Sequence, residues 1–265
     1  MRLFVSFGKK KEDFTMRKEP VIFCFVLPLL FLAGGCETAR QQYQNGLRYD
    51  DVGNSVEAVK CYRKAAERGH VEARITLARR YHDGLGVVKD YAEAVKWYHL
   101  AAEQDSPDAW YALGLLYKNG EGVVKDLAEA AKCFRQASDL GHAQSQFELG
   151  SCCYAGVGVA KDFSEAARWW RRAAEQGHAA AQYRLGALYA KGEGLLKDPA
   201  EAAKWYRKAA VQGFVPARYE LGMSLCSGEG VAKDVTEGSY WLCKAAKEGH
   251  KQAREACRKM NARWE

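Results

Sequence analysis

Glycine pairs, histidines and cysteines are the residues of this chain whose types and spacing could serve chemistry. The glycine pairs form a Gly-x-Gly motif, a composition that can cradle a phosphate. A dinucleotide-binding loop, however, follows a strand within a βαβ unit, whereas here a helical pattern precedes each copy. We therefore interpret the glycines as turn residues with positive φ angles. The pairs are Gly84/Gly86, Gly120/Gly122, Gly156/Gly158, Gly192/Gly194 and Gly228/Gly230.

Four of the six histidines recur at regular places, which raises the question of a metal site. If they lie in successive turns of a helical stack, neighbours are ~20 Å apart, far beyond the ~2 Å reach of a shared metal ion. The sequence also has no His-Glu-x-x-His, Gly-x-Ser-x-Gly or paired-cysteine metal motif. We therefore predict no catalytic residue, metal, cofactor or small-molecule substrate. The four histidines are expected to be turn and cap residues: His70, His142, His178 and His250.

The cysteines could form disulfides. Apart from two near the amino terminus, seven remain, so at least one thiol is unpaired within the chain. Antiparallel helices could join Cys133 to Cys152 or to Cys153, and Cys243 to Cys257, if the protein folds in an oxidising compartment. The alternative is that these residues are buried and pack as small apolar side chains.

The elements that position all these residues come from an internal repeat. Lys89-Asp90 returns four more times at a constant step (125 − 89 = 36), which is typical of stacked supersecondary units. Each unit reads as helix A, a glycine-containing loop and helix B, with short connections that favour antiparallel neighbours. The predicted fold is therefore all-α, a right-handed solenoid of stacked antiparallel helix hairpins with a period of 36 residues.

The repeat also sets the predicted domain boundaries. Residues 36–265 form the solenoid, in which the first unit is short and the last is a capping helix. The unit boundaries are 38–70, 71–106, 107–142, 143–178, 179–214, 215–250 and 251–265.

Two local patterns predict how each hairpin is built. Asp-x-x-Glu precedes every full helix B, as in Asp90/Glu93, and predicts a capping box. Helix A carries a glycine such as Gly114 in mid-helix, which costs about 1 kcal/mol relative to alanine. We expect close approach of a neighbouring helix to offset that cost. Arg258 replaces this glycine in the last unit, where no further repeat follows.

The ordered motifs Leu-Gly-x-x-Tyr, Gly-x-Gly-Val-x-x-Asp and Trp-Tyr-x-x-Ala-Ala-Glu-x-Gly resemble the Sel-one-like repeat of the tetratricopeptide-like superfamily. The resemblance covers about residues 38–265. It implies an α-solenoid that acts as a scaffold for other proteins. One lineage of cysteine-rich members binds β-lactams and pairs its cysteines regularly across the inter-repeat turns, a pattern that this chain lacks.

The amino-terminal segment predicts a targeting signal. Val21–Ala33 is a short apolar run after Arg17-Lys18, and it contains Pro28. Residues 1–35 resemble a bacterial lipoprotein signal, with Met16 as the expected start, and this resemblance implies lipidation at Cys36. An ordinary secretory signal or an uncleaved anchor is the alternative. A lipid anchor would tether the solenoid to a membrane of the cell envelope, facing the periplasm or the exterior.

A surface stripe is the predicted partner-binding site. Counted from residues 71, 107, 143, 179 and 215 as position one, positions two, six and nine of helix A share one face and vary between units. Solenoids hold extended partners on the concave surface that such helices line. The alternative is ordinary solvated surface. The candidate residues, which include two neighbours of the stripe, are Glu72, Thr76, Arg79, Asp108, Trp110, Leu115, Gln144, Glu148, Arg184, Arg218, Glu220 and Met223.

Charge narrows the class of partner. The net charge is +7, and the Lys and Arg residues are spread over all the repeats instead of forming the basic stripe that nucleic-acid binding requires. The sequence thus predicts a non-enzymatic adaptor for protein partners, anchored as an envelope lipoprotein. The alternatives are a secreted repeat protein that acts on a host or neighbouring cell, and a cell-wall hydrolase or β-lactam-binding protein.

Overall fold

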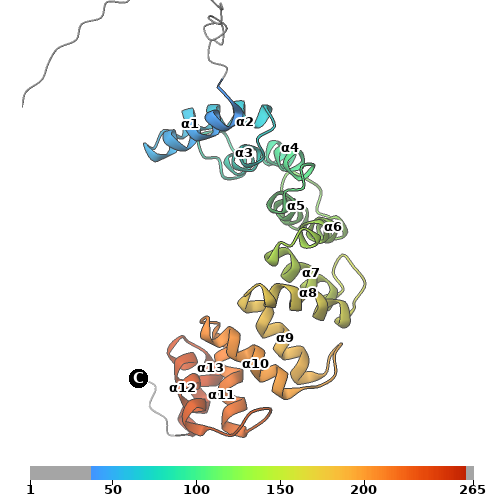
Figure 1. Ribbon diagram of the computed structural model, residues 1–265, viewed down its shortest axis with the longest axis vertical. Helices are drawn as coiled ribbons and strands as arrows, with labels where there is room; N and C mark the ends of the chain where they lie inside the picture. The colour runs from blue at the N-terminus through green and yellow to red at the C-terminus, as the bar shows by residue number, and fades with distance from the viewer. Residues whose placement is uncertain (1–36, 261–265) are drawn as a thin grey trace, which may run out of the picture. The chain divides into compact units, whose positions relative to one another are not determined.

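The computed structural model describes residues 37–260, which form thirteen α-helices and no strand (Figure 1). The helices belong to one compact unit that begins at Thr38. Their bounds are α1 Ala39–Asp51, α2 Ser55–Glu67, α3 Val71–Asp83, α4 Tyr91–Ala102, α5 Pro107–Asn119, α6 Leu127–Asp139, α7 Ala143–Ala155, α8 Phe163–Glu175, α9 Ala179–Lys191, α10 Pro199–Val211, α11 Val215–Ser227, α12 Val235–Lys247 and α13 Lys251–Lys259.

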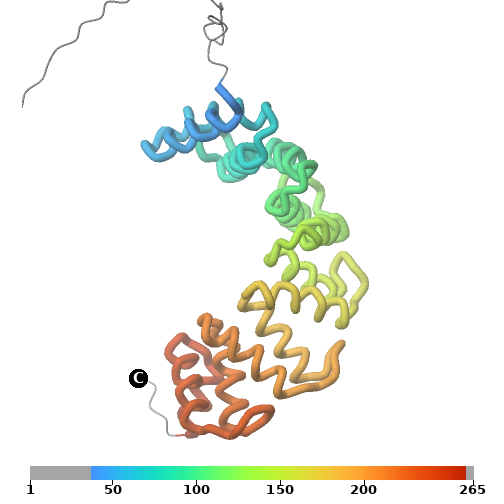
Figure 2. Tube along the Cα trace, in the orientation of Figure 1, coloured from blue at the N-terminus to red at the C-terminus, as the bar shows by residue number. Residues whose placement is uncertain are grey.

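Within this unit, extensive contacts join only helices that are consecutive in the chain. Each odd-numbered helix from α1 to α11 packs against the even-numbered helix that follows it to form a hairpin, each hairpin packs against the next, and α13 packs against α12 (Figure 2). This arrangement confirms the predicted all-α stack of helix hairpins. Because each hairpin touches only its neighbours, the fold positions side chains by repetition of one local geometry.

The starts of the even-numbered helices confirm half of the predicted capping box. Asp90 is the N-cap of α4, and its carboxylate accepts from the backbone N–H of Glu93 at 3.0 Å. The expected return bond from Glu93 is replaced, because the backbone N–H of Asp90 donates to the carbonyl of Tyr81 in α3 at 2.9 Å. The Glu93 carboxylate instead pairs with Lys96 at 2.5 Å. Asp90 thereby ties the loop to both helices of the hairpin.

The starts of the odd-numbered helices confirm the cap role of the histidines. His178 is the N-cap of α9, and its Nδ1 accepts from the backbone N–H of Ala181 at 3.1 Å. His70, His142 and His250 cap α3, α7 and α13 in the same way. Ser106 does so for α5 through its hydroxyl.

The loop glycines have the positive φ angles that the sequence predicts. Gly120 ends α5 at φ 79°, and Gly122 follows at φ 71°. A Cβ on Gly122 would lie 2.5 Å from the backbone of Tyr91 in the preceding hairpin. The first glycine therefore stops the helix, and the second lets the loop rest against the neighbouring repeat.

The mid-helix glycines allow close approach of a neighbouring helix, as the sequence predicts. A Cβ on Gly114 would lie 2.5 Å from the ring of Phe134, and one on Gly150 would lie 2.5 Å from the ring of Trp170. Both aromatic side chains belong to the helix B of the same hairpin and are almost fully buried. The neighbour that needs the space is thus the hairpin partner. Arg258 lies in α13, after which the structure describes no further helix.

The predictions for the amino-terminal segment, including lipidation at Cys36, lie outside the described residues. Among the helices that the structure does describe, none combines the length and the apolar character needed to cross a membrane. Those described residues also contain no group of three or more His, Cys, Asp or Glu side chains arranged to hold a metal ion.

Candidate partner-binding surface

The predicted stripe lies on the odd-numbered helices, and its residues differ in exposure. Glu72, Arg79, Asp108, Arg184 and Met223 are exposed. The half-buried members are Thr76, Trp110, Leu115, Gln144, Glu148 and Glu220, whereas Arg218 is buried. The stripe is therefore a mixture of solvent-facing side chains and side chains that also take part in packing.

The part of the stripe on α7 is occupied by bonds between repeats. The Glu148 carboxylate accepts from Nζ of Lys118 in α5 at 3.0 Å. The amide oxygen of Gln144 lies 2.8 Å from Nε2 of the cap residue His178. Glu148 and Gln144 therefore link three successive hairpins, and a partner at this point would have to compete with these contacts.

Arg218 and Trp110, the two residues proposed beside the stripe, both take part in contacts within the stack. The Arg218 side chain is 7% exposed, its Nε donates to the carbonyl of Ala210 at 3.1 Å, and its guanidinium pairs with Glu248. Gln182 makes the equivalent bond to a helix-B carbonyl one repeat earlier. Trp110 occupies the same repeat position in α5 and packs against the first core cluster. The structure thus gives Arg218 the role of an inter-repeat clamp.

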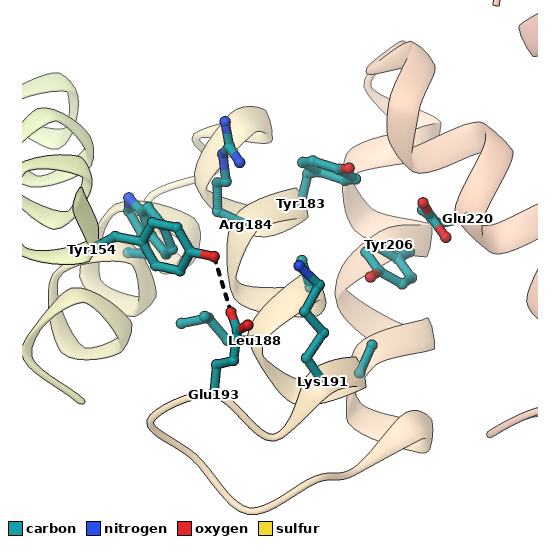
Figure 3. Close-up of a pocket in the computed structure, with 11 residues that line it drawn as sticks. Tyr154, Tyr183, Arg184, Leu188, Lys191, Glu193, Tyr206 and Glu220 are labelled. Atoms are coloured by element: carbon teal, nitrogen blue, oxygen red, sulfur yellow. Dashed lines mark hydrogen bonds between the residues drawn. The ribbon is translucent and has the colours of Figure 1, made fainter. Parts of the chain in front are cut away.

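Around α9 the surface is hollowed instead. The cavity has a volume of about 380 Å³ and is lined from α7, α8, α9, the loop after α9, α10 and α11. Its lining includes two stripe positions of α9, Arg184 and Ala187, and the sixth position of α11, Glu220. We call this cavity the α9 hollow (Figure 3).

The hollow exists because α9 has small side chains where other repeats have larger ones. Ala187 takes the ninth position, which is Arg79 in α3 and Leu115 in α5. Ala190 takes the twelfth position, which is Tyr154 in α7. Short side chains at two neighbouring surface positions leave space between the larger ones that flank them.

Charged groups surround this space. Figure 3 shows Arg184 and Lys191 extending from α9, with Tyr154 on one side and Tyr206 and Glu220 on the other. Within the described part of the chain neither cation forms an ion pair with a carboxylate. Both cationic groups are therefore available to a ligand.

The two carboxylates of the hollow differ. Glu193 accepts a hydrogen bond from the Tyr154 hydroxyl at 3.0 Å. Burial raises the pKa of Glu220, against the opposing effect of Lys191. Burial likewise raises the pKa of Tyr183. The α9 hollow thus combines the partly desolvated carboxyl group of Glu220, two cations that form no ion pair among the described residues, and aromatic side chains in its lining.

This combination suits the binding of a polypeptide segment. The half-buried aromatic rings of Tyr154 and Tyr183 offer apolar contact, while Arg184 and Lys191 offer charge-assisted hydrogen bonds to carboxylates or carbonyls. Ligand sites in proteins typically combine an apolar lining with a few polar groups in this way.

Several residues of the hollow were not predicted from the sequence, among them Tyr154, Lys191 and Glu193. A signal was nevertheless present at the twelfth position of helix A. His82 there lies 3.0 Å from Glu121, and Tyr154 lies 3.0 Å from Glu193, so this position bonds to the next loop in two repeats. The twelfth position varies between units as the stripe positions do, so it extends the predicted stripe toward the loop.

The cysteines occupy different environments. Cys133, Cys153 and Cys257 are buried, whereas Cys61, Cys152, Cys226 and Cys243 are half-buried. Burial raises the pKa of Cys133 and of Cys153 to about 12, as expected of thiols within a core. Cys133 packs in the first core cluster and Cys153 in another, and the Cys133 pairings stay predictions. Sγ of Cys243 lies 3.6 Å from Sγ of Cys257, and this bridge also stays a prediction.

The model of the Sel1 repeat matches six segments of the chain, at residues 39–70, 71–106, 107–142, 143–178, 179–214 and 215–250. No curated protein matches the chain significantly.

Two of the solved structures that are similar to it cover most of its length and are more than 30% identical in sequence. A protective antigen of uropathogenic Escherichia coli strains with an SLR fold is 33% identical, with a TM-score of 0.80 over 86% of this chain. The match covers 50% of that antigen, so the chain spans half its length. A Sel1 repeat protein from Oxalobacter formigenes is 31% identical, with a TM-score of 0.71, and the match covers 81% of this chain and 86% of that one.

Proposed function

The chain belongs to the Sel1 repeat family, and we propose that it is a non-enzymatic adaptor that holds a protein partner on the stripe and in the α9 hollow. Sel1 repeat proteins typically mediate protein–protein interactions, and the scaffold is generally non-catalytic. The observation that carries the proposal is the α9 hollow, because there the stripe combines open volume, aromatic surface and unpaired cations.

The proposal includes a membrane tether. The lipoprotein-like signal ahead of Cys36 supports an adaptor that is lipidated at this residue and faces the periplasm or the exterior. A fixed anchor would keep the stack close to partners in the same envelope. Labelling with a palmitate analogue tests this part: the wild type should be labelled and the Cys36→Ser variant should not. Equal labelling of both proteins would remove the anchor from the proposal.

Site-specific crosslinking tests the binding surface. A photoreactive amino acid at Ala187, inside the hollow, should capture a partner in native membranes, whereas the same amino acid at Lys132 should not. Lys132 is a suitable control because it is exposed on the even-numbered helix α6. Charge reversal of both Arg184 and Lys191 should abolish capture at Ala187. Equal capture from both positions would contradict a specific site.

Two alternatives remain testable with the same protein. A secreted protein that acts on another cell would be found in the culture medium and would not need Cys36. A cell-wall hydrolase or β-lactam-binding protein would release fragments from isolated wall material or retain a labelled β-lactam. Either result for the purified chain would replace the adaptor proposal.

A further inference from the structure

A cluster of sulfur atoms lies at the carboxyl-terminal end of the stack, away from the α9 hollow. Cys243 in α12 and Cys257 in α13 place their Sγ atoms 3.6 Å apart. Sδ of Met260, just after α13, lies 3.9 Å from Sγ of Cys226 in α11. All four side chains belong to one cluster around Leu242.

Comparison with the other repeats shows that packing does not require sulfur at these places. The position of Cys243 is arginine in most repeats, including Arg171 and Arg207, whose side chains reach forward to Tyr189 and Glu237 in the next repeat. The position of Cys257 is leucine in every full repeat, as in Leu221. An arginine and a leucine are both replaced by cysteine where the two helices meet.

From this geometry we propose that Cys243 and Cys257 form a binding site for a soft monovalent cation, Cu(I), with the Met260 thioether as a third ligand. Thiolate and thioether sulfur are the ligands that select Cu(I). This site has no part in the proposed adaptor function and is tested independently of it.

The distances fit one ion between the two thiolates. Two sulfur atoms 3.6 Å apart can both lie about 2.3 Å from one metal ion, with an angle of ~100° at the ion. That angle leaves one side open for a third ligand. Met260 is the C-cap of α13, three residues after Cys257, and its Sδ lies in the same cluster, 3.9 Å from Sγ of Cys226.

The ligand set disfavours Zn²⁺. Structural zinc sites use four Cys, His or carboxylate ligands, and the described residues contain no group of three or more such side chains that could hold a metal. Two thiolates and one thioether give a coordination number of three, which a soft monovalent ion such as Cu(I) accepts. Binding is a proton exchange: Cu⁺ displaces one proton from each thiol, and the complex carries one negative charge. No oxidant or reductant takes part.

Anaerobic titration tests the site. The full chain is reduced, freed of reductant and titrated with Cu(I) in competition with a Cu(I) chelator. We expect one equivalent bound at this site, with an ultraviolet thiolate-to-copper absorption band. Cys243→Ser and Cys257→Ser should each weaken binding by at least ~100-fold, and Met260→Leu by roughly 10-fold. Cys61→Ser, which changes a cysteine of α2, is the matched control and should bind as the wild type does.

Circular dichroism must show that each variant keeps its helix content. If Cys257→Ser does not fold, because this side chain is fully buried, Cys243→Ser still decides the question, since Cys243 is half-buried. The proposal is overturned if the reduced wild type binds Cu(I) no more tightly than Cys243→Ser does, or if Zn²⁺ alone competes equally. It is also overturned if Cys243 and Cys257 form a disulfide on oxidation but the reduced protein does not remove Cu(I) from the chelator.

Discussion

The two sides of α9 are built in different ways. On the side packed against α10, Gly186 leaves room for Tyr206, whose ring a Cβ would approach to 2.8 Å. The same glycine–large side chain contact recurs between Gly114 and Phe134. On the stripe side, residue type changes from repeat to repeat. The difference indicates that the first side holds the hairpins together and the second is available for binding.

The largest effect is expected for loss of a buried aromatic side chain on the hairpin side. Trp170→Ala should lower the free energy of unfolding by about 3–5 kcal/mol. The ring is 2% exposed, and its Nε1 donates to the carbonyl of Phe147 at 3.1 Å. Urea unfolding followed by circular dichroism measures the change. Trp205→Ala, which removes a half-buried tryptophan from the next helix B, should cost clearly less.

The second-largest loss of stability is expected when a methyl group is added where the two helices of a hairpin touch. Gly114→Ala should destabilise the protein by roughly 1–3 kcal/mol, because overpacking against Phe134 exceeds the gain in helix propensity. The equivalent position in α3 is Ala78, which is fully buried. Ala78→Gly is therefore the reciprocal control and should cost about 1–2 kcal/mol, from lower helix propensity and the loss of a buried methyl group. A stabilised Gly114→Ala protein would show that the contact is not tight.

The caps between hairpins make stability depend on pH. Burial lowers the pKa of His142 and His178 below the ordinary value. As pH falls through the unfolded pKa of about 6.5, the unfolded chain binds protons that the folded chain does not, so stability decreases until the folded pKa is passed.

His178→Ser should reduce this loss between pH 7 and pH 5. Serine caps the equivalent helix α5 through Ser106, so the cap itself is kept. The lost contact with Gln144 changes the level of stability and not its slope with pH. His82 acts in the opposite direction, because its hydrogen bonds with Asp83 and Glu121 raise its pKa despite burial. Thermal unfolding across this pH range, with His82→Gln as the comparison, separates the two contributions; an unchanged slope in His178→Ser would contradict the assignment.

A smaller effect is expected where one turn departs from the repeat. Asp105 has a φ of 56° at the position that is glycine in the other inter-repeat turns, such as Gly141. Relief of this left-handed conformation should outweigh the added freedom of the unfolded chain, so Asp105→Gly should stabilise the protein by about 0.5 kcal/mol. Gly141→Asp is the reverse change and should destabilise it. Chemical denaturation at pH 7 compares the pair.

These contrasts also show how far sequence reasoning reached. The helix hairpins, the positive-φ glycines and the cap roles of Asp90 and His178 follow from local patterns, and the structure confirms them. The return arm of the capping box was wrong, because the backbone N–H of Asp90 finds a carbonyl in the preceding helix. That contact depends on how the hairpin closes, which no local motif contains.

The α9 hollow could not be predicted for a similar reason. Its volume depends on Ala187 and Ala190 being small at once, and on larger side chains from α7 and α11 that surround them. Arg218 shows the converse, since its sequence position beside the stripe gave no indication that its guanidinium is used within the stack. A pattern in the sequence identifies a helix face, but the contacts within the folded stack determine which residues of that face can bind a partner.

The smallest effect on stability is expected on the stripe itself, where the effect on binding should be largest. Arg184→Glu should change the free energy of unfolding by less than about 0.5 kcal/mol, because the side chain is exposed and forms no ion pair within residues 37–260. Capture of the partner should nevertheless fall sharply, since the reversed charge would repel a carboxylate placed between Arg184 and Lys191. Arg207→Glu is the matched control: it breaks the ion pair with Glu237 on helix B and should leave capture unchanged. Loss of capture in both variants would show that net charge, and not the hollow, recruits the partner.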